Sequence, residues 1–242
     1  MAIDYSGSGQ YHVTSSTPVT QSPLTMACWF NSDSATATQV LCSVAHSTST
    51  GLVYFTLEAA GAIAGDPIRH RSRNGPTGTV DSTTGYTAGQ WHHACAVVAS
   101  TTSRAAYIDG GSKGTNSTSV SSSSALDRIG LGCLAIQTAT TLTNGRIAEV
   151  GIWNVALTDD QVLSLARGYS PLCVQPQGLV FYAPLVRNVQ DVRGGLTLTA
   201  TGSPTVADHC RIIYPHNRIV VPKITAAAGG RPARVIGGGI FV

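Results

Sequence analysis

Carboxylates come first among the residues that could do chemistry, because paired carboxyl groups carry out glycoside hydrolysis. A retaining glycosidase needs two of them about 5–5.5 Å apart, one as nucleophile and one as acid/base. The chain has only two glutamates, Glu58 and Glu149, and neither lies two to five residues from another acidic residue. Two carboxylates could meet only through the tertiary fold, so the sequence predicts a protein that is not an enzyme.

Metal ligands are equally sparse. His92 and His93 are adjacent, and adjacent strand residues point to opposite faces of a sheet, so the pair cannot hold one ion together. We expect one ring to be packed and the other solvated. The six cysteines have long, irregular spacings without a Cys-x-x-Cys pair, which disfavours zinc and favours reduced thiols, mostly buried, over disulfides. We therefore expect neither a metal site nor a cofactor from these residues.

Tyrosines are the residues most suited to a sugar, because aromatic rings stack on the apolar faces of saccharides. The candidate glycan contacts are Tyr54, Tyr86, Tyr107 and Tyr169. Each of them also fits a half-buried strand position, and aromatic residues make up only 6% of the chain. The two interpretations stay open at this point.

Charge is distributed unevenly along the chain. The net charge is +3, but no acidic residue follows Asp208, so the basic excess lies at the carboxyl end. We interpret residues 217–242 as an extended arm that binds a partner through its cations and its apolar end: Arg218, Lys223, Arg231, Arg234, Ile240, Phe241 and Val242. These cations are spread between apolar residues, which disfavours nucleic acid. The alternative is an arm that folds back on its own body.

Short alternating apolar runs separated by Gly, Ser, Thr, Asn and Asp predict β-strands. The predicted strands cover residues 24–30, 51–57, 93–99, 104–108, 128–131, 146–153, 178–185, 195–200 and 211–214, with a further edge strand at 219–225. One short helix is expected after Thr158, where Gln161 completes a capping box and Gly168 ends the helix. This spacing predicts an all-β, antiparallel jelly-roll sandwich over residues 1–216, followed by the arm.

The amino-terminal sequence has no basic leader followed by an apolar core, so no secretory signal peptide is expected. No stretch approaches the roughly 20 apolar residues of a membrane span, so no membrane partner is expected either.

Two stretches resemble the concanavalin A-like lectin/glucanase superfamily, in its laminin-G-like branch. The first is Gly-Gln-Trp-His-His from Gly89, with the later Tyr-Ile-Asp-Gly hairpin at Tyr107; the second runs from Gly145 to Val162. The resemblance implies a sandwich of two curved sheets. It also implies a weak calcium site, for which Asp33 and Asp109 are the candidates, although Asp109 has a simpler role as the turn residue of an Asp-Gly hairpin.

The enzymatic members of that superfamily carry two glutamates on one strand, a pattern this chain lacks. We therefore predict a non-enzymatic structural or binding protein. The resemblance is to the phage virion-associated type, a capsid decoration or fibre subunit made in the host cytoplasm. Its partners would be capsid or other virion proteins and further copies of itself. The alternative is a carbohydrate-binding module that acts on a host surface glycan.

Overall fold

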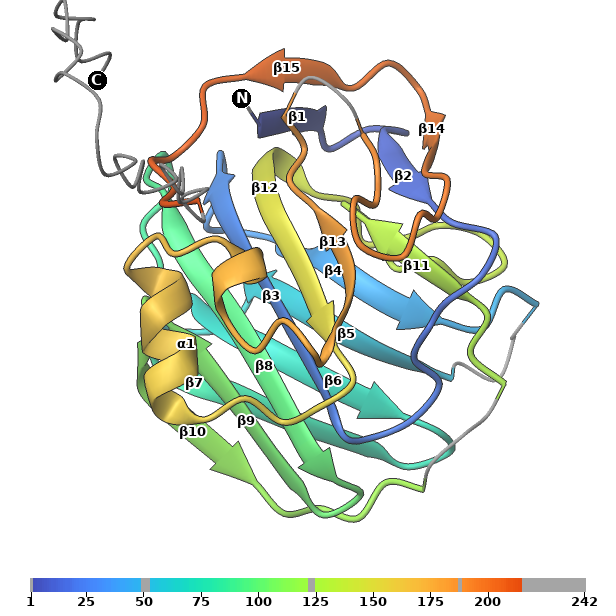
Figure 1. The fold of residues 1–242 in the computed structure, drawn as a ribbon, viewed down its shortest axis with the longest axis vertical. Helices are drawn as coiled ribbons and strands as arrows, with labels where there is room; N and C mark the ends of the chain where they lie inside the picture. The colour runs from blue at the N-terminus through green and yellow to red at the C-terminus, as the bar shows by residue number, and fades with distance from the viewer. Residues whose placement is uncertain (1, 49–52, 122–124, 187–188, 215–242) are drawn as a thin grey trace, which may run out of the picture.

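Two antiparallel sheets face each other in the computed structural model of the chain (Figure 1). The structure describes residues 2–48, 53–121, 125–186 and 189–214. The predicted arm at 217–242 and the predicted edge strand at 219–225 lie outside these residues.

The eight-stranded sheet has the order β10-β9-β8-β3-β12-β1-β15, and β13 pairs with β12 beside this path. Its strands are β1 (Ala2–Ser6), β3 (Leu24–Ser32), β8 (His92–Ser100), β9 (Ser103–Ile108), β10 (Gly111–Asn116), β12 (Asn144–Trp153), β13 (Leu179–Ala183) and β15 (Thr205–Ala207). Because β1 pairs with β15, this sheet places the amino-terminal strand beside the last strand of the described residues.

The seven-stranded sheet has the order β14-β2-β11-β4-β5-β6-β7. Its strands are β2 (Tyr11–Val13), β4 (Thr38–Ala45), β5 (Tyr54–Ala60), β6 (Pro67–Arg73), β7 (Thr77–Gly85), β11 (Arg128–Leu131) and β14 (Thr199–Thr201). The predicted all-β antiparallel sandwich is therefore confirmed.

The inner faces of the two sheets form the main core. Alternate residues of each strand point inward, as Met26, Cys28 and Phe30 do on β3 and Phe55 and Leu57 do on β5. Apolar burial contributes about 25 cal/mol per Å², so this contact is the main stabilising interaction of the body.

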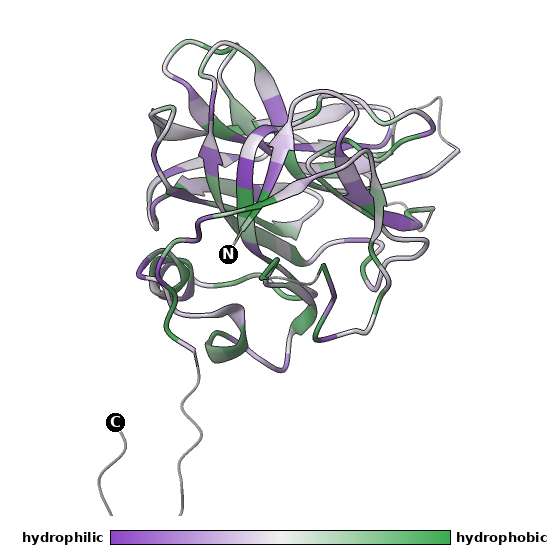
Figure 2. Cartoon of the chain, turned by 90° about the horizontal axis from the view of Figure 1, so that it is seen from above, coloured by the Kyte–Doolittle hydropathy of each residue, from purple (hydrophilic) through white to green (hydrophobic). Residues whose placement is uncertain are grey.

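A second apolar layer covers the outer face of the eight-stranded sheet. The helix α1 (Asp159–Ala166) and the short 3-10 helix η1 (Pro171–Cys173) lie over it, and Leu179 and Tyr182 of β13 face this layer from the sheet itself (Figure 2). Val162 and Leu165 of the helix pack with Trp153 of β12 and Tyr107 of β9. One sheet is thus buried on both faces over much of its area.

The helix begins as the sequence predicts. The Thr158 hydroxyl accepts the amide of Gln161 at 3.3 Å, and the Gln161 side chain accepts the amide of Thr158 at 2.9 Å. This capping box satisfies two of the free amides at the helix start. Gly168 follows the helix with φ +89°, a conformation that glycine adopts without strain.

The predicted strand at 211–214 is wrong. Only Ile213 forms a bridge, to Tyr169 in parallel orientation, and it is an isolated one. The segment crosses the outer side of the eight-stranded sheet instead of joining it, and its backbone bonds go to the loop after α1, at Gly168 and Ser170.

The six cysteines, all within the described residues, are free thiols, and Cys28, Cys42, Cys95 and Cys133 are buried. No helix of the described residues is long and apolar enough to cross a membrane.

Three histidines, His12, His70 and His93, are buried in the sandwich and are neutral there. Burial lowers the pKa of His12 and His93 to about 4 and that of His70 to about 3. The His70 ring bonds the carbonyl of Thr56 and the hydroxyl of Ser72, both at 2.7 Å, so it is satisfied without a charge.

Acidification should therefore unfold the protein. Unfolded histidine titrates near pH 6.5, so between about pH 6.5 and 4 the unfolded chain binds more protons, and the free energy of unfolding falls as pH falls. Each of these three histidines contributes a slope of about 1.4 kcal/mol per pH unit in that range. Urea unfolding at several pH values measures this slope, and His70→Gln should reduce it by about a third. A flat profile above pH 4.5 would contradict the neutral buried histidines.

Candidate functional site

A groove of about 500 Å³ lies on the outer side of the eight-stranded sheet. Its wall is formed by β8, β9 and β10 together with the start of α1, and its polar lining residues include Lys113, Thr115, Asn116 and Asp159. The helix covers the rest of this face, so the groove lies where the second apolar layer ends.

Tyr107, Lys113 and Asp159 form one hydrogen-bonded group in this groove. Asp159 accepts the Tyr107 hydroxyl at 2.8 Å and the Lys113 ammonium at 2.8 and 3.1 Å. The Lys113 nitrogen also stands 5.5 Å from the centre of the Tyr107 ring, within the range of a cation–π contact. The groove thus presents a cation and an anion side by side, above a covered aromatic ring.

The electrostatics of this group fix its charge state. The hydrogen bonds from Lys113 and from Tyr107 hold the pKa of Asp159 below its usual value. Burial, with the hydrogen bond to Asp159, raises the pKa of the Tyr107 phenol. At neutral pH Asp159 is therefore a carboxylate that can accept hydrogen bonds in the groove.

The four candidate tyrosines are not brought together. Tyr54 and Tyr86 are 4% exposed and present no ring face at the surface. Tyr107 lines the groove but is 3% exposed, beneath Lys113. Tyr169 is 43% exposed and borders a separate hollow of about 260 Å³ with Gln161, Ser164 and Gln175.

The two calcium candidates, Asp33 and Asp109, lie in different loops of the sandwich. Asp109 is the turn residue, with φ +51°, and accepts the ring of His92 and the amide of His93, each at 2.8 Å. Asp33 is exposed beyond β3. Within the described residues there is no group of three or more His, Cys, Asp or Glu side chains that could hold a metal.

The two glutamates lie on opposite outer faces of the sandwich. Glu58 stands between Leu57 and Ala59, which point into the main core, so it faces away from that core on the seven-stranded sheet. Glu149 bonds Tyr182, which packs in the apolar layer outside the eight-stranded sheet. These two side chains cannot form the carboxylate pair of a glycosidase.

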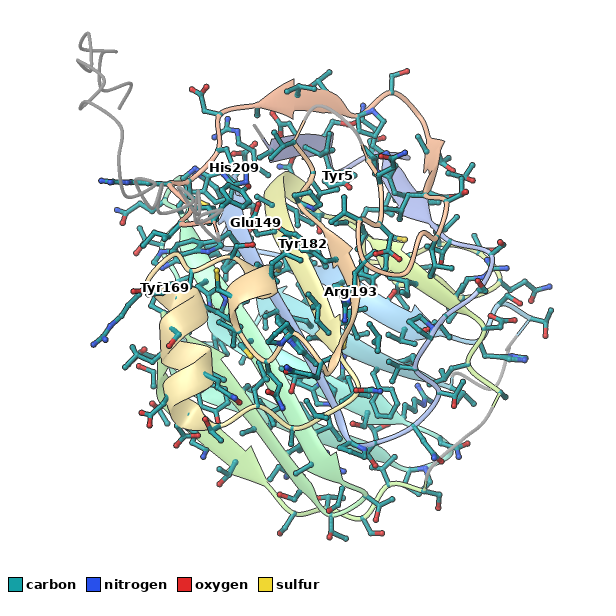
Figure 3. All side chains as sticks on the ribbon, viewed as in Figure 1. Tyr5, Glu149, Tyr169, Tyr182, Arg193 and His209 are labelled. Carbon is teal, nitrogen blue, oxygen red and sulfur yellow. The ribbon has the colours of Figure 1, made fainter. Side chains whose placement is uncertain are left out.

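Glu149, a buried carboxylate, forms a polar cluster that the sequence did not predict (Figure 3). Its carboxylate accepts the hydroxyl of Tyr182 at 2.6 Å and that of Tyr214 at 3.0 Å, and the His209 ring nitrogen lies 3.3 Å away. Tyr214 and His209 belong to the last described segment, residues 208–214. This segment is therefore fastened to β12 through one glutamate.

The backbone of Glu149 is unusual as well. It has φ +55°, and the pairing of β12 with β3 shifts between Ala148 and Gly151. A non-glycine residue in this region costs about 1–3 kcal/mol. The bulge also marks where β12 changes its second neighbour from β1 to β13. Glu149 thus lies where the neighbour of β12 changes from β1 to β13, and its side chain binds the 208–214 segment at the same point.

Glu149→Gln should loosen this segment, because the amide cannot accept from both tyrosine hydroxyls as the carboxylate does. We expect hydrogen exchange at the amide of Ile213, which bonds Gly168 at 2.7 Å, to rise by about tenfold. Glu58→Gln is the matched control, a buried glutamate on the other sheet, and should leave this amide unchanged. Equal exchange in the Glu149 variant and the parent would contradict the anchoring role.

The arm residues Arg218, Lys223, Arg231, Arg234, Ile240, Phe241 and Val242 lie outside the described residues. The structure gives only their point of departure, the segment that Glu149 holds.

Comparison with solved structures shows the same fold in several carbohydrate-related proteins. The carbohydrate-binding module CBM40 of the Ruminococcus gnavus IT-sialidase, bound to alpha2,3 sialyllactose, has a TM-score of 0.58 at 18% identity over 68% of this chain and 96% of the module. Domain 4 of an extracellular arabinanase from Geobacillus stearothermophilus, in complex with arabinotriose, has a TM-score of 0.55 at 20% identity over 68% of this chain and 76% of that chain.

A heptameric SAP-like pentraxin from Limulus polyphemus has a TM-score of 0.55 at 16% identity over 84% of this chain and 93% of the pentraxin. No curated protein matches the sequence closely. The family model of the concanavalin A-like lectin/glucanases superfamily matches residues 6–163, more than half of the chain. Together with the two-sheet sandwich, this match shows that the chain belongs to the concanavalin A-like lectin/glucanase superfamily.

Proposed function

We propose that this protein is a non-catalytic carbohydrate-binding module whose ligand lies in the groove along β9, β10 and the start of α1. The observation that carries the proposal is the groove itself, with its adjoining Lys113 and Asp159. Its volume of about 500 Å³ falls within the range of small-molecule sites. Relatives of the same fold include two modules whose structures hold a saccharide.

The chemistry of the lining suits a sugar. A saccharide hydroxyl both donates and accepts, so neighbouring hydroxyls are best met by a carboxylate, an ammonium and side-chain hydroxyls together. Asp159, Lys113 and Thr115 supply these groups. The Tyr107 ring lies under Lys113, so hydrogen bonding carries more of the recognition than stacking does.

The lining also argues against hydrolysis in the groove. Asp159 is the single acidic residue among the residues that form it. Retaining and inverting glycosidases both place two carboxyl groups on either side of the scissile bond. A bound sugar would therefore be held and released unchanged.

A glycan array followed by calorimetry with the best neutral oligosaccharide tests the proposal. Lys113→Ala should weaken that binding about tenfold, because it removes a charged donor. Arg167→Ala is the control, since it deletes an exposed cation at the far end of the same helix. An array without any hit, or equal losses in the two variants, would reject the groove as the site.

The virion role predicted from the sequence rests on different residues. It requires the 217–242 arm to attach the body to capsid proteins or to further copies of the chain, with the sandwich facing outward toward a host glycan. The supporting observations are the basic, apolar composition of the arm and the heptameric assembly of one relative of the same fold. This role and glycan binding are compatible, because they use different parts of the chain.

A further inference from the structure

The outer face of the seven-stranded sheet carries a row of arginines. Arg69, Arg71 and Arg73 alternate along β6 with Ile68, His70 and Ser72, which are buried. Because successive strand residues point to opposite faces, the three arginine side chains leave β6 on one face, with their Cα atoms about 6.8 Å apart along the strand. All three are partly exposed. This row, Arg69, Arg71 and Arg73, is called the arginine row below.

Two members of the arginine row are already paired. Arg69 binds both oxygens of Asp81 on β7, at 2.6 and 2.7 Å. Arg71 binds one oxygen of Glu58 on β5 at 2.8 Å, and this carboxylate is completely buried. Cross-strand pairs of this kind stabilise the sheet, so the charge of these two arginines has a structural explanation.

Arg73, in contrast, has no carboxylate partner on a neighbouring strand. Its side chain makes no hydrogen bond or ion pair within the described part of the chain, and its Nε atom is buried without a partner. Its cross-strand neighbours are Tyr54 on β5 and Thr77 on β7, neither of which is acidic. A buried donor without an acceptor is unfavourable, and a guanidinium is the side chain that best matches a carboxylate or sulfate.

We propose that the arginine row is an anion site, in which Arg73 binds a carboxylate or sulfate group of an acidic saccharide. Arg71 stands two residues away on the same face, and its positive charge adds to the attraction that Arg73 exerts on the anion. The hydroxyls of Thr77 and Thr79, opposite Arg73 and Arg71 on β7, can donate to the same ligand. Asp81 lies one position further along, beside Arg69, and does not face Arg73.

This site is separate from the proposed groove. The groove lies outside the eight-stranded sheet and the arginine row lies outside the seven-stranded sheet, with the main core between them. The two proposals therefore fail independently: the groove variant Lys113→Ala should leave anion binding unchanged, and Arg73→Gln should leave the binding of a neutral ligand unchanged.

The test uses the full chain and a matched pair of saccharides. Lactose and 3′-sialyllactose differ only by one acidic sugar, and a sulfated heparin disaccharide and inorganic sulfate complete the set. Binding is followed by NMR titration of the backbone amides at low and at physiological salt. We expect saturable shifts at Arg73, Thr77 and Thr79 with an acidic saccharide, weakened by salt, and none with lactose. Inorganic sulfate distinguishes a saccharide site from a general anion site. A saccharide site should bind the sulfated or sialylated sugar at least tenfold more tightly than inorganic sulfate, whereas a general anion site should bind them equally.

Arg73→Gln should weaken the acidic saccharide about tenfold or more, since it removes a charged donor. Arg146→Gln is the matched control: it makes the same charge change at a partly exposed arginine of β12, on the other sheet. Thermal unfolding of each variant checks that the body still folds. The proposal is overturned if no acidic probe gives saturable shifts on β6 and β7, or if the two substitutions weaken binding equally.

Discussion

The contact between the inner faces of the two sheets is the interaction on which the rest of this structure depends. It fixes the register of every long strand, because a slip of one residue would turn the apolar side chains outward. Once Phe30, Phe55 and Leu57 point inward, the side chains between them must face outward. The outer faces then differ: one sheet is covered by a second apolar layer, and the other exposes arginine, threonine and aspartate on β6 and β7.

The second apolar layer determines where a ligand can approach the eight-stranded sheet. Helix α1 and η1 bury Trp153 of β12 and Tyr182 of β13, and the cover ends at β9 and β10, where the groove opens. Asp159 has two roles there, because it opens the helix at its positive end and also binds Tyr107 and Lys113. At the other end of the cover, Glu149 holds the segment that leads into the arm. The groove with Asp159 and the cluster of Glu149 therefore lie at the two ends of the second apolar layer.

Much of the architecture was predictable from the sequence because its signals are local. The capping box of Thr158 and Gln161 and the fully apolar run of β8 each specify their element within a few residues. The β6 strand was missed because its inward residues include His70 and Ser72, which are polar and bond one another, so the apolar alternation is hidden. The alternating arginines of β6 were a signal that could have revealed it.

The sites were less predictable because they depend on residues far apart in the chain. Tyr107 was a candidate, but its burial under Lys113 and its bond to Asp159 depend on how α1 meets β9. Glu149 stood out only as a lone acid in an apolar run, and its positive φ depends on a bulge between three strands. No pattern in the sequence places Tyr214 and His209 beside it.

The most direct test of the account is the position of a bound neutral oligosaccharide, determined by crystallography of the complex with the best ligand of the array. The account predicts electron density for the sugar along β9 and β10, within hydrogen-bonding distance of Lys113 and Asp159. A sugar found instead beside Tyr169, or on the strands of the seven-stranded sheet, would contradict it.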